Sequence, residues 1–75
     1  MPKLPIISGK EVIKILQKRG YFVDHQTGSH IILRHKDPPH RRTTVPNHST
    51  IAKGTLLAIL RETGITREEL FELIQ

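Results

Sequence analysis

A chain of 75 residues without cysteine can form one domain, residues 1–75, but neither a second domain nor a disulfide framework or Cys-type zinc site. No apolar run approaches the roughly 20 residues that cross a bilayer, and the N-terminus lacks a signal-peptide core, so we expect a soluble, cytoplasmic protein without a membrane partner. Twelve Lys and Arg against seven Asp and Glu give a formal net charge of +5, which favours nucleic acids as partners, although basic small domains without such partners are also common.

A first helix is predicted to begin at Ser8, which forms a capping box with Glu11. The Ser8 hydroxyl can accept from the Glu11 amide while the Glu11 carboxylate reaches back. Gly20 supplies the left-handed residue that ends this helix. The apolar stripe at helical spacing is Val12, Ile15 and Leu16, with Ile13 as a further candidate.

Two strands are predicted next, over residues 21–26 and 29–36, because both segments are rich in aromatic and β-branched residues. Thr27-Gly28 between them suits a tight hairpin turn. With these two residues as the loop, Gln26 faces Ser29 and His25 faces His30. The continuous run Ile31-Ile32-Leu33 leaves open which side of the second strand is buried.

Asp37-Pro38-Pro39 predicts a turn, because two prolines cannot continue a strand ladder. A third strand over residues 41–45 follows, and Pro46 ends it. A second helix is predicted to begin near Gly54 and to close at Gly64. Its apolar face consists of Leu56, Ile59 and Leu60.

Thr66 and Glu69 form a second capping box, which opens a short last helix burying Leu70, Leu73 and Ile74. The complete order is α-β-β-β-α with a short C-terminal helix. This order predicts an α+β fold in which the helices cover one face of a three-stranded antiparallel sheet. It resembles the double-stranded RNA-binding fold.

Three short motifs follow one another along the chain: Gly28-Ser29-His30 at the start of the second strand, Val45-Pro46 with His48, and Gly54-Thr55-Leu56. Together with the Ser8-Gly9-Lys10 opening they resemble the HicA (YcfA) toxin family over essentially the whole chain. The resemblance implies a toxin of a type II toxin–antitoxin pair, a ribosome-independent endoribonuclease that cleaves messenger RNA and is inhibited by a HicB-type antitoxin. It also implies that His30 is catalytic.

Histidine suits such a reaction, because RNA cleavage by the 2′-hydroxyl needs a general base, a general acid and positive charge on the phosphate. The ordinary pKa of histidine, near 6.5, leaves much of it neutral at pH 7. Ser29 is either an orienting or phosphate-binding group or a simple turn former. His48 is either a second proton-transfer group or a residue of the loop that precedes the helix.

Basic residues for the phosphates are numerous, and each one alone fits an ordinary solvated surface as well. Lys53, with the amides at the start of the second helix, offers an anion site. Lys10, Lys14 and Lys18 recur every four residues and line one exposed helix face. The remaining candidates for RNA binding are Arg34, Arg41 and Arg42.

No cofactor is expected, and metal-independent cleavage is predicted. The inferred register sets His25 beside His30, and two imidazoles can share a proton or bind a transition metal. A metal needs further ligands, however, and the Asp24 side chain is expected to point to the opposite face from His25. The sequence also lacks the acidic cluster of a two-metal nuclease.

The alternative is a non-catalytic double-stranded-RNA-binding module of the same fold, which grips A-form phosphates through the lysine face and the start of the second helix. A stacking platform for single-stranded RNA is disfavoured, because the chain has only three aromatic residues, Tyr21, Phe22 and Phe71.

Overall fold

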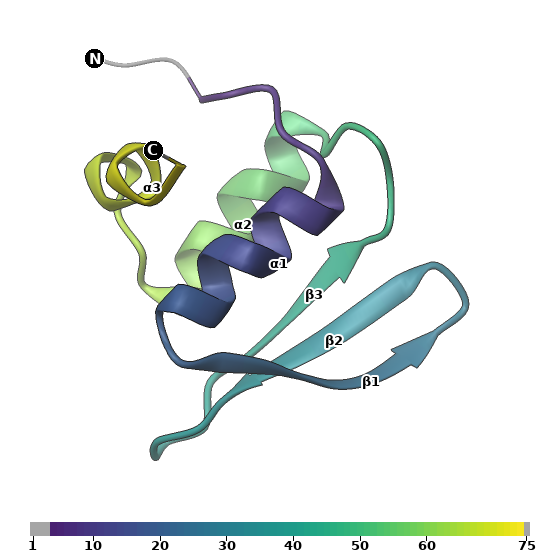
Figure 1. Cartoon of the computed structure of the whole chain (residues 1–75), viewed down its shortest axis with the longest axis vertical. Coiled ribbons are helices and arrows are strands. Elements are labelled where there is room, and N and C mark those ends of the chain that lie inside the picture. Colours follow the sequence, from purple (N-terminus) through teal and green to yellow (C-terminus); the bar gives the residue numbers. More distant parts are fainter. Residues whose placement is uncertain (1–3, 75) are drawn as a thin grey trace.

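The computed structural model describes residues 4–74 and confirms the predicted order of elements in that part of the chain. Strands β1 (Tyr21–Thr27), β2 (His30–His35) and β3 (Arg42–Pro46) form an antiparallel sheet in the order β1-β2-β3. Helices α1 (Gly9–Lys18) and α2 (Lys53–Thr63) cover one face, and α3 (Arg67–Ile74) packs beside α1 (Figure 1). This is the expected α+β arrangement, consistent with the double-stranded RNA-binding fold.

The helix ends follow the local signals in the sequence. Ser8 forms both hydrogen bonds of its capping box with Glu11, at 3.2 Å each. Thr66 and Glu69 form the second box at 3.2 and 3.1 Å. Gly64 ends α2 with a φ of 75°, a left-handed conformation that glycine adopts without a steric penalty.

The core lies between the helices and the sheet. The predicted apolar residues of α1 and α2 are buried there except Ile13, which is partly buried, and Leu70 of α3 is buried as well. Ile74 was expected to be buried as well, but 40% of it is exposed. The reason is that α3 packs on one side, against α1, and its last residue lies at the rim of a groove that Lys18 and Leu73 also line.

The predicted hairpin register was wrong. The turn consists of Gly28 and Ser29, so that Thr27 pairs with His30, and His25 pairs with Ile32 rather than with His30. Gly28 has a φ of 59°, and the first position of a two-residue loop is where type II′ turns place glycine. A bulge between Val23 and His25 shifts the register again, which the sequence pattern did not indicate.

The two faces of the sheet differ in character. Ile31 and Leu33 belong to the core with Val45. His30, Ile32 and Arg34 alternate with them along β2 and therefore lie on the helix-free face. This alternation resolves the orientation of β2, which the continuous apolar run had left open. Within residues 4–74, no helix is long and apolar enough to cross a membrane.

Candidate active site

His30 is the first residue of β2 and is exposed on the helix-free face. Its backbone lies between two strands, opposite Thr27 of β1 and opposite Pro46 of β3. A side chain on a strand with partners on both sides is held more firmly than one on a loop. The fold therefore presents an imidazole to solvent on a fixed support.

Three distant chain segments meet beside His30. The Asn47 amide donates to the Ser29 carbonyl at 2.7 Å, and the Gly9 amide donates to the His48 carbonyl at 2.9 Å. These bonds hold the hairpin turn, the end of β3 and the start of α1 together at one end of the sheet, on the right of Figure 1. Ser29, His48 and Lys10 thus lie at the same end of the molecule as His30, and all three are exposed or partly exposed.

Gly9 makes this junction possible. A Cβ atom at position 9 would lie 2.2 Å from the Pro46 carbonyl oxygen, a distance that no real Cβ atom tolerates. The requirement for glycine comes from the close approach of α1 to the end of β3. Since it depends on a contact between distant segments, local sequence reasoning missed it.

His25 is bound to Asp24 rather than placed beside His30. The His25 Nδ1 atom lies 2.7 Å from the Asp24 Oδ2 atom, and the Arg34 Nε atom lies 3.7 Å from that same oxygen. The prediction that Asp24 and His25 point to opposite faces was therefore wrong, because the bulge interrupts the alternation of β1. Among the described residues, no group of three or more His, Asp or Glu side chains is placed to hold a metal ion.

The hydrogen bond from His25 lowers the pKa of Asp24 below its ordinary value of 3.8, and the nearby Arg34 guanidinium acts in the same direction. A carboxyl whose pKa is lowered by folding stabilises the fold above its ordinary pKa. That contribution is lost as the pH falls through the lowered pKa. The effect belongs to the acid range and leaves Asp24 ionised at neutral pH.

Replacing His25 by alanine will raise the pKa of Asp24 toward 3.8, because the largest cause of the lowering is removed. An NMR titration of the Asp24 carboxyl measures this change. His48→Ala removes an exposed histidine from the loop after β3 and serves as the matched control. An Asp24 pKa that stays low in the His25→Ala protein will show that Arg34 alone maintains it.

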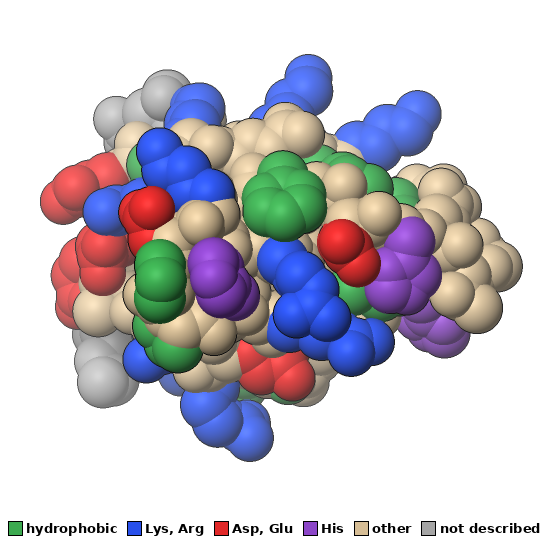
Figure 2. All heavy atoms as spheres, turned by 90° about the horizontal axis from the view of Figure 1, so that it is seen from below, with side chains coloured by type: hydrophobic (Ala, Val, Ile, Leu, Met, Phe, Trp, Pro, Cys, Tyr) green, Lys and Arg blue, Asp and Glu red, His purple; other side chains and the backbone are tan. Residues whose placement is uncertain are grey.

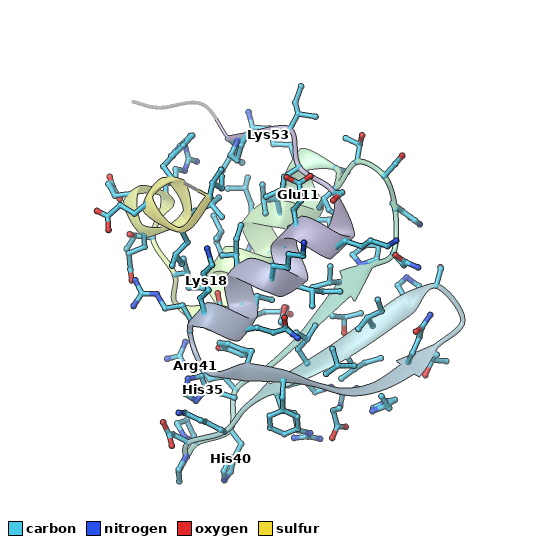
Figure 3. The ribbon with its side chains drawn as sticks, in the orientation of Figure 1. Glu11, Lys18, His35, His40, Arg41 and Lys53 are labelled. Atoms are coloured by element: carbon cyan, nitrogen blue, oxygen red, sulfur yellow. The ribbon has the colours of Figure 1, made fainter. Side chains whose placement is uncertain are left out.

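The predicted basic residues do not form one cluster. Arg34 and Arg42 are cross-strand partners, and the alternation of both strands places them on the helix-free face, where Figure 2 shows Lys and Arg side chains beside exposed histidines. Arg41 lies with His35 at the far end of the sheet (Figure 3), in a pocket of about 280 Å³. Its Nη1 atom is directed to the Glu62 carbonyl at 3.5 Å.

Lys10, Lys14 and Lys18 are exposed along α1 as predicted. The ammonium group of Lys18 donates to the Leu73 carbonyl at 3.1 Å, and Lys14 lines the same groove between α1 and α3. Lys53 is exposed at the start of α2, at the opposite end of the helical layer from Arg41 (Figure 3). Lys10 is the lysine of this set nearest the His30 end of the sheet, because it belongs to the first turn of α1.

The fold and this site define a small basic α+β domain, consistent with the double-stranded RNA-binding fold, with an exposed histidine at one end of its sheet. The sequence model of the family described as "HicA toxin of bacterial toxin-antitoxin" matches residues 9–65, so the chain belongs to the HicA toxin family. This membership implies an antitoxin as a partner. No curated protein matches the chain.

Proposed function

We propose that this toxin is a ribosome-independent endoribonuclease that cleaves messenger RNA without a metal ion, with His30 as general base or acid. The observation that carries the proposal is the position of His30, exposed and fixed between two strands on a sheet face that also bears Arg34 and Arg42. A HicB-type antitoxin holding the enzyme inactive in the cytoplasm completes the proposal, and the family supports the antitoxin.

The chemistry requires two proton transfers. A base removes the proton of the 2′-hydroxyl, whose oxygen attacks the adjacent phosphorus in line and forms a bond to it. The bond from phosphorus to the 5′-oxygen breaks, and an acid gives that oxygen a proton. The products are a 2′,3′-cyclic phosphate and a 5′-hydroxyl end.

His30 performs one of these transfers in the proposal. His48 is the candidate for the other, since the Gly9–His48 and Asn47–Ser29 hydrogen bonds hold its loop at the same end of the sheet. Ser29 adjoins His30 and serves to orient it or to bind phosphate. Positive charge on the reacting phosphate stabilises the transition state.

The basic residues of this proposal supply positive charge to the phosphates of the RNA. Arg34 and Arg42 share the sheet face of His30, and Lys10 lies at its end of the molecule. The remaining basic residues are proposed to contact more distant parts of a long RNA. They are Lys14, Lys18, Arg41 and Lys53. Removal of any one of these cations is expected to make RNA binding less dependent on salt concentration.

The alternative is a double-stranded-RNA-binding module that grips A-form phosphates through the lysine face of α1 and the start of α2. Lys18 of that face donates to the carbonyl of Leu73, and α3 packs along the flank of α1 that Lys14 shares. Because the enzyme and the module use the same basic side chains, cleavage of RNA rather than binding distinguishes them.

The test is a digestion of long single-stranded RNA by the purified protein in the presence of chelator, with the fragment ends mapped. We expect cleavage that leaves cyclic phosphate and 5′-hydroxyl ends. An oligonucleotide with a single 2′-deoxy residue at the cut site is the matched control and is expected to resist. Cleavage that requires added divalent metal, or cleavage of the 2′-deoxy site, will contradict the mechanism.

A further inference from the structure

Within residues 4–74, Phe22 is the one Phe or Tyr that the fold leaves open to solvent on the helix-free face. Tyr21 is 5% exposed and packs edge-on against His35, and Phe71 is partly buried in α3. Phe22 is 45% exposed, and its cross-strand partner is Arg34. A single exposed apolar side chain is unremarkable by itself, so its neighbours decide what it means.

The neighbours of Phe22 form a row across all three strands, since Phe22 pairs with Arg34 and Arg34 pairs with Arg42. Figure 2 shows this face of the molecule, with basic side chains grouped beside an exposed hydrophobic one. Like charges directly opposite on a sheet destabilise it, so the Arg34–Arg42 pair does not serve the stability of the fold. Arg42 takes part in none of the ion pairs among residues 4–74, and Arg34 is 3.7 Å from the Asp24 carboxylate.

This combination matches the chemistry of a nucleotide in single-stranded RNA. An aromatic face stacks on an unpaired base, and an arginine guanidinium binds a phosphate through two parallel hydrogen bonds. Within residues 4–74, the one ion pair made by this row joins Arg34 to Asp24, and the Asp24 carboxylate is also bound by His25. Arg42, on the other side of Arg34, therefore remains for an external anion.

Arg34, the central residue of this row, lies on the same strand and the same sheet face as His30. Arg34 lies four residues after His30 on β2, which corresponds to about 13 Å along an extended strand. A ligand that reaches both positions has to be longer than one nucleotide. Continuity with His30 thus favours a chain of RNA over an isolated nucleotide as the occupant.

We propose that Phe22, Arg34 and Arg42 form a subsite that stacks one nucleobase and binds an adjacent phosphate of the single-stranded RNA cleaved at His30. This inference rests on the proposed ribonuclease function and adds the path of the substrate across the helix-free face. One stacking position rather than a platform is consistent with the small number of aromatic residues.

Fluorescence tests the stacking directly, because the natural chain has no tryptophan. Phe22→Trp places a single reporter in the subsite. Val23→Trp is the matched control, since Val23 is also 45% exposed but pairs with the buried Leu33 of the core. Titration with a 2′-O-methyl oligonucleotide, which lacks the attacking hydroxyl, is expected to quench the fluorescence of Phe22→Trp and to leave that of Val23→Trp nearly unchanged.

Alanine variants test the contribution to affinity. Phe22→Ala is expected to raise the Kd for the same oligonucleotide about tenfold, in line with the loss of one stacked base, and Val23→Ala less than twofold. Arg42→Ala is expected to raise the Kd and to reduce its salt dependence. Thermal unfolding of each variant verifies that the fold persists.

Two results will overturn the subsite. One is equal quenching, or none, at positions 22 and 23 together with an unchanged Kd in Phe22→Ala. The other is an unchanged Kd for RNA in the Phe22→Ala and Arg42→Ala proteins combined with weaker binding of the antitoxin by these variants. That result makes this face a protein-docking surface. Quenching at position 22 in a protein that never cleaves RNA will instead refute the proposed enzyme and retain the RNA-binding subsite.

Discussion

Replacement of His30 by alanine will reduce the rate of RNA cleavage by about 10²–10⁴-fold, the range typical of a positioned proton-transfer group. RNA affinity is expected to change little, because the phosphate contacts of the proposal come from arginine and lysine side chains. The fold is expected to persist, since His30 is exposed and lies outside the core. Single-turnover cleavage of a short RNA, with binding measured separately, separates the two effects.

His25→Ala is the matched control for His30→Ala. It removes a second exposed histidine from the same sheet face, but one whose ring is bound to Asp24 and whose strand partner is Ile32. Its cleavage rate is expected to stay within a few-fold of the parent. If His30→Ala retains more than a tenth of the parental rate, or if His25→Ala loses as much as His30→Ala, the role given to His30 is refuted.

Replacement of Gly9 by alanine will destabilise the protein by about 1–3 kcal/mol, the usual cost of forcing an extra carbon into a packed site. The added Cβ lies 2.2 Å from the Pro46 carbonyl oxygen, a backbone atom that moves only if α1 and the end of β3 separate. A small domain of about 5–15 kcal/mol total stability will show this loss plainly. Denaturant titration followed by far-UV circular dichroism measures it.

Gly54→Ala is the matched control for Gly9→Ala, because a Cβ at position 54 meets no atom within 4 Å. Gly54 lies in the first turn of α2, where alanine favours the helix by about 0.5–1 kcal/mol over glycine. The two glycine-to-alanine substitutions are therefore expected to change stability in opposite directions. Equal stability of the Gly9→Ala protein and the parent will show that the junction can relax at little cost.

The elements of the fold were predictable because local signals mark them. Each of these signals acts within one turn of the chain. The capping boxes mark the predicted helix starts at Ser8 and Thr66, and glycines with positive φ follow the first two helices at positions 20 and 64. Apolar spacing then identified the buried faces of α1 and α2. The hairpin register was not predictable in the same way, because the turn consists of Gly28 and Ser29 rather than Thr27 and Gly28. The bulge before His25 adds a second shift without a compositional signal.

The candidate site was predictable only in part. The position of His30 at the start of β2 follows from the turn glycine and the strand pattern. The neighbours of His30 depend on how distant segments meet, so the pairing of His25 with Asp24 and the separation of Arg41 from Arg42 came only from the structure. The solvent-facing position of Phe22 followed from β1 being an edge strand with one uncovered face.

The junction of three segments beside His30 makes the geometry of the proposed active site depend on cooperative folding. Gly9, Ser29 and His48 are separated by long stretches of sequence, and backbone hydrogen bonds between their segments exist only when the whole domain is assembled. A chain in which β1 and β2 have paired without the end of β3 and the loop that follows it lacks these bonds. The proposed active site is therefore complete only in the fully folded domain.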